Sequence, residues 1–466
     1  MRTRNVRRSL GACAVLVAAG CSQDLVPPPD PLPQVSSATI EANSTMVVAA
    51  TVRVAGFGDS VRVAFHAEGA TGSDSASAAV MLPRNDAVDV PVLGLLPQTS
   101  YLMRAVVFFR GDSAMSNPLA LTTGALPADL PSYTTSGTAP DPGYFVFSAG
   151  NYGLVIDHTG RVVWYRRFPP AGPGLNFMAQ LNGRYIGRVV TPDTTDDDPM
   201  VEYGATGAAQ RSLRCLNGRR LRFHDLLVAA DGSYWIMCDD TRIMDLTATG
   251  GQVSARVTAT TVQHISDAGA LLFEWNAFDH FPITDLEPAQ ALGPNVNFTH
   301  GNAIDLDSDG NLLVSFRSLH EVTKVNTTTG AVMWRMGGRR NQFMFTGPGA
   351  PGFFGQHNVR AIGAGRIILL DNTGSADSRY ERYAIDATTM TATLEQWYSS
   401  SVQTQIGGSV QQSGASRFLV SFGTTGRVEE FDQSGATLWR ISGNPGYVFR
   451  AQRIGSLYHP IPTGTR

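Results

Sequence analysis

Apolar and polar residues alternate along much of the chain in runs that are too short for helices. From residue 35 to residue 125 the clearest runs are 45–54, 60–66 and 101–109. Alternation with a period of two predicts β-strands that are buried on one face. A stretch of about 90 residues with this pattern has the size of one β-sandwich. We predict a sandwich over 35–125, followed by a proline-marked linker over 126–142.

The remainder of the chain, residues 143–466, repeats itself. A glycine followed by apolar residues and a tryptophan ends three segments, 160–164, 330–334 and 435–439. A second repeated element is a strand, a glycine turn and an apolar strand. Together these elements mark six units, 143–170, 175–211, 222–276, 298–338, 355–398 and 408–443. Repeated units of this size with four short strands are typical of propeller blades. The alternative, two stacked sandwiches, would not give the glycine turns a common phase.

The sequence therefore predicts an all-β protein, a six-bladed β-propeller preceded by a small β-sandwich. The composition agrees with this fold class, because only 16% of the 466 residues are charged and 48 are glycine. Disordered chains and coiled coils need far more charge, so both are excluded. The formal net charge of −3 gives no basic footprint, and we expect no nucleic-acid partner.

The first 34 residues have the pattern of an export signal followed by a tether. Four arginines precede an apolar run over 9–19, which is too short to span a bilayer, so we predict a signal peptide over 1–20. The small residues before Cys21 resemble a bacterial lipoprotein signal and predict a lipid anchor on that cysteine. Ordinary secretion is the alternative. The proline-rich segment 21–34 would be a spacer, and Ser22 in place of aspartate favours the outer membrane.

Two cysteines follow the predicted signal peptide and the predicted lipidation site, and export would place both in an oxidising compartment. These are Cys215 and Cys238. Thiols in an oxidising compartment can pair. The sequence leaves two predictions open, a disulfide between them or two buried free thiols.

Three histidines occupy equivalent places in three consecutive units. His224, His300 and His357 lie 8, 10 and 8 residues before the turn glycines of their units. Because the first strand of a blade lines the central channel, we expect the three imidazoles to converge at one mouth of it. Asn302 lies two residues after His300 and should point to the same side of the strand. Arg317 is predicted at the channel end of the following strand.

This set of imidazoles, an amide and a guanidinium favours an anionic ligand. Arginine presents a fixed fork of donors to oxyanions and keeps its charge when it is desolvated. A three-histidine zinc site is the alternative, although an arginine beside a dication is unfavourable. We expect neither a metal nor a cofactor, and no Gly-x-Ser-x-Gly elbow supports a serine hydrolase. The other histidines considered are predicted to be structural: His66, His158, His264 and His280.

Several segments resemble arylsulfotransferases, the aryl-sulfate sulfotransferases. The segments are 272–275 with 279–280, 297–305, 309–317, 332–338, 355–357 and 369–372. Segments 297–305 and 309–317 contain the His-x-Asn…Arg core of the family, and the similarity runs from about 145 to 450. Asn358 follows His357 where the family leads us to expect aspartate or another small polar residue. Separately, residues 95–101 resemble the tyrosine corner of fibronectin type III domains.

The resemblance implies an enzyme that moves a sulfuryl group from a phenolic sulfate ester to a phenol acceptor without a nucleotide sulfate donor. It implies that His357 is the nucleophile and forms a sulfohistidine. His300, Asn302 and Arg317 would hold the sulfuryl oxygens, and His224 would act as acid and base. No metal or organic cofactor is implied. The alternative is a non-catalytic cell-surface propeller that binds a glycan, a peptide or a sulfated ligand.

Overall fold

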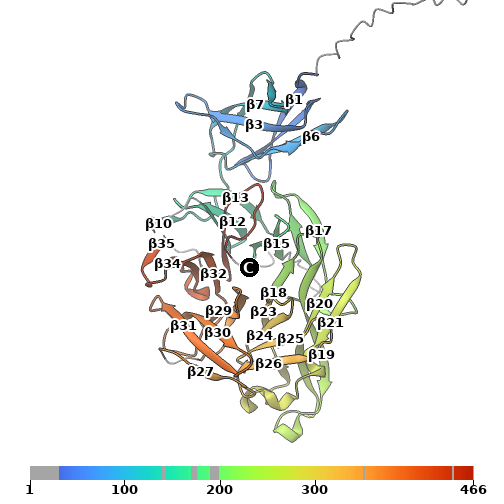
Figure 1. Cartoon of the computed structure of the whole chain (residues 1–466), viewed down its shortest axis with the longest axis vertical. Coiled ribbons are helices and arrows are strands. Elements are labelled where there is room, and N and C mark those ends of the chain that lie inside the picture. Colours follow the sequence, from blue (N-terminus) through green and yellow to red (C-terminus); the bar gives the residue numbers. More distant parts are fainter. Residues whose placement is uncertain are drawn as a thin grey trace, which may run out of the picture.

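The computed structural model of the protein shows a small β-domain above a larger ring of sheets (Figure 1). The residues it describes are 31–138, 143–168, 176–188, 199–349, 352–442 and 446–464. The predicted signal peptide and Cys21 lie outside the described residues. Among the described residues, no helix has the length and apolar character needed to cross a membrane.

The small domain consists of two packed sheets. One sheet has the order β1 (Gln34–Ala42), β2 (Ala49–Phe57) and β6 (Ala87–Leu93). The other contains β3 (Ser60–Ala67), β4 (Ser75–Ala76), β5 (Val80–Met81), β7 (Ser100–Phe109), β8 (Asp112–Met115) and β9 (Leu119–Thr122). The Tyr101 hydroxyl oxygen accepts the Leu96 N–H at 2.8 Å, which is the kind of contact a tyrosine corner makes.

The ring consists of six sheets, counted over the described residues. The first three contain β11 (Tyr144–Ala149), β12 (Tyr152–Asp157), β13 (Val162–Arg167) and β36 (Ala451–Ile454); β14 (Met178–Ala179), β15 (Tyr185–Arg188), β16 (Met200–Tyr203) and β17 (Ala209–Leu213); and β18 (Arg220–Val228), β19 (Tyr234–Met244), β20 (Ala255–Ile265), β21 (Leu271–Asn276) and β22 (Asn295–Asn297).

The other three sheets complete the ring. They contain β23 (Gly301–Leu306), β24 (Leu312–Phe316), β25 (Glu321–Val325) and β26 (Val332–Gly337); β27 (Met344–Thr346), β28 (His357–Ala361), β29 (Arg366–Asp371), β30 (Arg379–Asp386) and β31 (Thr391–Ser399); and β32 (Ser409–Gly414), β33 (Arg417–Ser421), β34 (Val428–Asp432), β35 (Thr437–Ser442) and β10 (Thr134–Gly137). Short 3₁₀ helices lie in the connections at Thr247–Thr249, Ala277–Asp279, Ile283–Asp285, Pro288–Ala291 and Gly423–Thr425. The predicted fold, a six-bladed propeller preceded by a sandwich, is confirmed.

Both ends of the propeller segment take part in closing the ring. Strand β36, near the C-terminus, is the innermost strand of the first blade and pairs with β11. Strand β10 is the outermost strand of the last blade and pairs with β35. Each end of the segment thus adds a strand to the first or the last blade, which closes the ring. The sequence patterns did not reveal it, since β10 lies in the stretch predicted to be a linker.

The repeated tryptophan has a structural reason. The indole N–H of Trp164 donates to the Ala205 carbonyl at 2.7 Å, and that of Trp275 donates to the Gly330 carbonyl at 3.1 Å. Trp439 donates to the His158 carbonyl at 2.9 Å. Each tryptophan thus ends one blade and satisfies a turn carbonyl of the next blade. The last of these bonds joins the sixth blade to the first.

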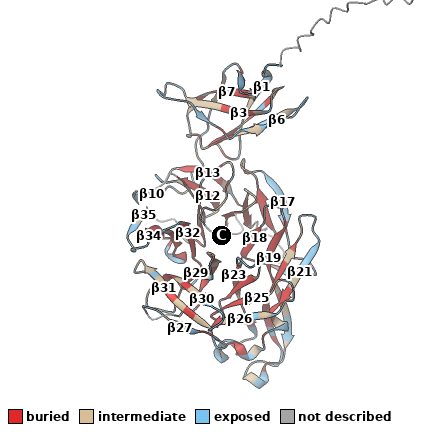
Figure 2. Ribbon diagram, in the orientation of Figure 1, coloured by how far each residue is buried: buried red, intermediate tan, exposed pale blue. Residues whose placement is uncertain are grey.

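The sandwich rests on the first blade, at the rim of the ring (Figure 1). Met46, Val48 and Leu93 belong to the same buried apolar cluster as the strands of that blade. The Val47 N–H donates to the Tyr165 hydroxyl at 3.0 Å. Buried residues are concentrated along the propeller strands, whereas parts of the outer strands such as β17 and β21 are exposed (Figure 2). The sandwich therefore contacts the rim of the ring, and the inner strands line its centre.

A disulfide joins the second and third blades. The structure pairs Cys215, which follows β17, with Cys238 in β19. Of the two possibilities that the sequence left open, the structure has the disulfide.

Candidate active site

The inner strands of three neighbouring blades bring His224, His300 and His357 together. The rings of His224 and His300 have centroids 4.9 Å apart. The ring of Phe449 lies between His224 and His357, with centroids 5.8 and 6.5 Å away. The three imidazoles therefore line one region of the channel, where their equivalent spacing placed them.

Each of the three inner strands loses its regular register where it carries site residues. The register shifts between Leu221 and Leu226 in β18, between Gly301 and Ala303 in β23, and between His357 and Arg360 in β28. Bulges re-aim side chains and are frequent beside active sites. The irregularities let adjacent residues of one strand face the channel at different depths.

The tautomer of His357 is fixed by Asn372, which directly follows β29. The amide nitrogen of Asn372 donates to the carbonyls of Thr404 and Gly407, both at 3.0 Å. Its carbonyl oxygen must therefore be the atom that faces Nδ1 of His357 at 2.8 Å. Because this oxygen only accepts, Nδ1 carries the proton and Nε2 carries a lone pair. The Gly407 N–H donates a hydrogen bond to this lone pair on Nε2 at 3.3 Å.

His357 is neutral at physiological pH. Its side chain is almost fully buried, and this burial, together with the charges of Arg317 and Arg450, lowers its pKa to about 4. Hydrogen bonds from Nδ1 to Asn372 and to the Gly355 carbonyl act in the opposite direction, but burial is the larger effect. Nε2 is thus unprotonated without a general base, and its lone pair becomes available when the Gly407 N–H is displaced.

His300 is held in the opposite tautomer. Arg222 donates to the amide oxygen of Asn297 at 3.2 Å, so the amide nitrogen of Asn297 faces Nδ1 of His300 at 2.6 Å. Nδ1 accepts this bond, and Nε2 must carry the proton. Burial and the charges of Arg222, His357 and Arg317 hold the pKa of His300 well below its usual value. His300 is therefore a neutral hydrogen-bond donor.

Arg317 directly follows β24 and supplies a cation without a counter-ion. The one hydrogen bond of its side chain among the described residues goes from Nη2 to the Gln405 carbonyl at 3.2 Å, and its buried Nε has no partner there. No carboxylate of the described residues pairs with it. The charge of Arg317 instead acts on the imidazoles and lowers the pKa values of His300 and His357. A partly buried cation in this state favours an anionic ligand.

His224 has a free ring nitrogen. The side chain is buried against Phe223, with ring centroids 4.4 Å apart, and Nδ1 has no partner among the described residues. Burial, followed by the effects of His300 and Arg222, holds its pKa well below the usual value for histidine. This imidazole is neutral, and its pKa depends on the charges around it.

The two asparagines near the nucleophile segment have other partners than the sequence suggested. The amide nitrogen of Asn302 donates to the Gln356 carbonyl at 2.6 Å, and its buried carbonyl oxygen has no partner among the described residues. Asn302 thus contacts the residue before His357. Asn358 does not support the imidazole, because its side-chain oxygen accepts the Val410 N–H at 2.9 Å.

Three residues of the site were not identified from the sequence. Asn372 ends the family-like segment 369–372, so its signal was present but had no assigned role. Arg222 lies two residues before His224, and His320 lies three residues after Arg317. His264 and His280 lie away from the channel, stacked on Trp235 and Trp275 of the third blade. Within the described ranges, no group of three His, Cys, Asp or Glu side chains is placed to hold a metal.

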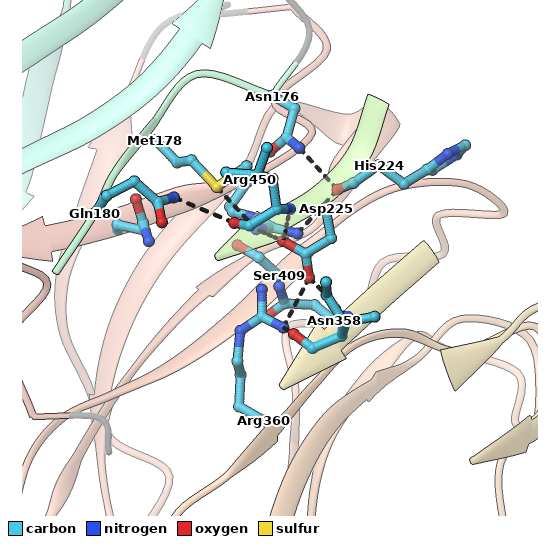
Figure 3. A network of polar contacts seen from close by, with 12 residues as sticks. Asn176, Met178, Gln180, His224, Asp225, Asn358, Arg360, Ser409 and Arg450 are labelled. Atoms are coloured by element: carbon cyan, nitrogen blue, oxygen red, sulfur yellow. Dashed lines mark hydrogen bonds and ion pairs between the residues drawn. The ribbon is translucent and has the colours of Figure 1, made fainter. Parts of the chain in front are cut away.

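A second polar layer crosses the channel next to the histidines (Figure 3). Asp225, adjacent to His224 in β18, accepts hydrogen bonds from Arg450 at 2.6 Å and from Arg360 at 3.0 Å. Arg450 also donates to the His224 carbonyl at 3.2 Å, as Asn176 does at 2.7 Å. This network ties the first, third and fifth blades together and fixes the backbone that carries His224.

One comparison with known proteins covers the segment that contains this site. A family model described as arylsulfotransferase (ASST) matches residues 218–444, which contain every predicted catalytic residue. Similar solved structures include a Bacteroides caccae protein of unknown function (12% identity, 68% of this chain, 100% of that chain, TM-score 0.44) and Staphylococcus aureus virginiamycin B lyase (12% identity, 75% and 94%, TM-score 0.35). No curated protein matches the chain. Residues 218–444 thus match the arylsulfotransferase family.

Proposed function

We propose that the protein transfers a sulfuryl group from a phenolic sulfate ester to a phenol acceptor through a sulfohistidine on His357. The observation that carries this proposal is the tautomer of His357, in which Asn372 holds the Nδ1 proton and leaves Nε2 unprotonated. Burial keeps the pKa of this imidazole at about 4, so the lone pair is not protonated at neutral pH. A ligand-binding module has no need of such a nucleophile.

In the first half-reaction, Nε2 of His357 attacks the sulfur of the donor. The N–S bond forms, the bond between sulfur and the aryl oxygen breaks, and the phenolate leaves with the electron pair. Because Nδ1 keeps its proton, the ring of the sulfohistidine is an imidazolium. The Asn372 oxygen that accepts this proton stabilises the positive charge.

The sulfuryl oxygens are held by donors that converge near His357. Arg317 contributes a guanidinium whose Nε is free, and His300 contributes its Nε2–H. Both groups are partly buried and held by hydrogen bonds before the reaction, so they stabilise charge on the sulfuryl oxygens with little reorganisation. The fork of Arg317 matches two oxygens of one sulfuryl group. Asn302 contributes by fixing the Gln356 backbone beside the nucleophile.

His224 delivers a proton to the leaving phenolate and removes one from the acceptor. Before the donor binds, burial and the neighbouring cations keep its pKa low. The negative charge of a sulfate ester offsets these cations, which raises the pKa of His224 and lets it take up a proton. After the leaving group has been protonated, the neutral imidazole accepts the proton of the incoming phenol. The oxygen of that phenol then attacks sulfur, and the N–S electron pair returns to Nε2.

Export and lipid anchoring at Cys21 are part of the same proposal. They rest on the basic and apolar pattern of residues 1–20 and on the small residues before Cys21. Mass spectrometry of the N-terminal peptide of the natively expressed protein tests them. A diacylglyceryl-modified cysteine in the outer-membrane fraction is the expected result, and an unmodified soluble N-terminus contradicts it.

The catalytic proposal is tested with a chromogenic aryl sulfate, with and without an added phenol. We expect slow release of the chromogenic phenol from the donor alone and faster release when an acceptor phenol is present, with the acceptor sulfated. His357→Ala should show neither. If the parent protein is inert toward several aryl sulfates but binds them, the binding-module function is supported instead.

A further inference from the structure

His320 is a fourth buried histidine beside the candidate nucleophile. It lies in the turn between β24 and β25, three residues after Arg317, and its side chain is 7% exposed. Its backbone has a φ of 53°, in the left-handed region that non-glycine residues seldom adopt. Outliers of this kind concentrate at functional sites, where surrounding contacts hold them in place. His300, at φ 47°, shares this feature.

A chain of hydrogen bonds leads from His320 to His357 through one residue. The Gly355 N–H donates to Nδ1 of His320 at 3.0 Å, and the Gly355 carbonyl accepts from Nδ1 of His357 at 3.1 Å. Gly355 has a φ of 63°, and a Cβ there would lie 3.0 Å from the Thr373 hydroxyl oxygen. Glycine is thus suited to this position, and its amide orientation depends on the acceptor that His320 supplies.

The segment around Gly355 is attached to the fourth blade at further points. The side chain of Gln356 donates to the Ser315 hydroxyl at 3.0 Å and to the Glu321 carbonyl at 2.9 Å. Phe354 stacks on the ring of His320, with centroids 3.3 Å apart. The turn that carries Arg317 and the segment that carries His357 are therefore held together by polar and aromatic contacts, of which His320 makes two.

We propose that His320 is a positioning residue for sulfuryl transfer, which holds the Gly355 carbonyl against Nδ1 of His357 and so aims Nε2 at the donor sulfur. This role rests on the proposed function of His357. It requires His320 to be neutral, because a protonated imidazole has no acceptor for the Gly355 N–H. Burial and the charge of Arg317 meet this requirement, since they lower the pKa of His320 to about 4.

Two substitutions of nearly equal shape separate the hydrogen bond from the packing. His320→Asn places an amide oxygen near the position of Nδ1 and tolerates a positive φ, whereas His320→Leu offers no acceptor. We expect the rate constant for sulfohistidine formation to fall roughly 10–100-fold in His320→Leu. In His320→Asn it should stay within a few fold of the parent. Donor affinity should change little in either, and His264→Leu, a histidine replaced outside the channel, is the control.

A second measurement reports the hydrogen bonding of His357 Nδ1 without any sulfuryl transfer. In protein labelled with ¹⁵N-histidine, the Nδ1–H resonance of His357 should move in His320→Leu and stay in place in His320→Asn. Equal losses of rate in both variants, an unaffected His320→Leu, or an unmoved resonance would overturn the role of His320. If the parent forms no sulfohistidine, the proposed function fails while the resonance still decides whether His320 positions His357.

Discussion

Two polar layers of the same channel differ in how their charges are balanced. In the layer of Figure 3, Asp225 lies between Arg450 and Arg360, so its negative charge has two cationic partners. In the histidine layer, Arg317 has no carboxylate partner among the described residues. Arg450 and Arg317 both keep a nitrogen without a partner there, but only Arg450 is neutralised by an acid.

This difference separates a structural role from a binding role. Buried charges that are paired and hydrogen-bonded hold blades together, and removing one partner leaves the other charge uncompensated. Arg317, a partly buried cation beside neutral imidazoles, lacks that compensation among the described residues. An anionic group, such as the sulfuryl oxygens of a sulfate ester, can provide it. The predictions below test this division, beginning with the largest effect.

Replacing the nucleophile should have the greatest consequence. His357→Ala removes the atom that carries the sulfuryl group, so transfer should fall to the uncatalysed background. Donor binding should persist, since Arg317 and His300 remain. Steady-state transfer and equilibrium binding of an aryl sulfate measure the two effects. Substantial transfer by His357→Ala, together with its loss in His224→Ala, would assign the nucleophile to the other histidine.

In the paired layer the effect should appear in stability. Asp225→Asn leaves Arg360 and Arg450 buried without their acid, and the free energy of unfolding should fall by about 3–5 kcal/mol. Denaturant unfolding measures this change. The control is Asp89→Asn, which breaks the exposed pair with Arg53 and should cost less than about 1 kcal/mol. Equal effects in both variants would show that the network is not a structural clamp.

In the histidine layer, where Arg317 has no carboxylate partner among the described residues, we expect a loss of activity with little loss of stability. Arg317→Lys keeps the charge but loses the planar fork, so kcat should fall by roughly 10²–10³ while the unfolding free energy changes little. Transfer kinetics and denaturant unfolding of the same sample test both parts. A large loss of stability with normal kinetics would place Arg317 in the structural class with Arg450.

Protonation of His357 should stop sulfohistidine formation at a lower pH than it would for a histidine with an ordinary pKa. Because the folded pKa of His357 is about 4, sulfohistidine formation should persist below pH 6 and decline as the pH falls through about 4. The unfolded chain binds this proton near pH 6.5, so between pH 6.5 and 4 acidification favours unfolding. The loss attributable to His357 should be on the order of 3 kcal/mol. His357→Gln should be less acid-sensitive in unfolding experiments, and an acid limb near pH 6.5 would contradict this environment.

The sequence predicted features that recur and missed those that occur once. Six units were visible because glycine turns recur with their strands and because some blades end in a tryptophan, of which three bond a turn carbonyl of the next blade. The closing strands β10 and β36 have four residues each and carry no repeat, so only their distant partners identify them.

The same rule applies to the site. His224, His300 and His357 were found because they share a position in three blades. Asn372 and His320 have no such counterparts, and their roles depend on contacts made in space. Asn372 is oriented by carbonyls 32 and 35 residues away, and His320 contacts Gly355, 35 residues away. No local pattern contains these contacts.

The most direct test of the account is the mass of the peptide that contains His357 after the protein has met an aryl sulfate donor alone. We expect one added sulfuryl group on that histidine, in about stoichiometric amount, and its loss when a phenol acceptor is added. An adduct on His224 or His300, or turnover without any adduct under conditions that trap it, would contradict the central role of His357.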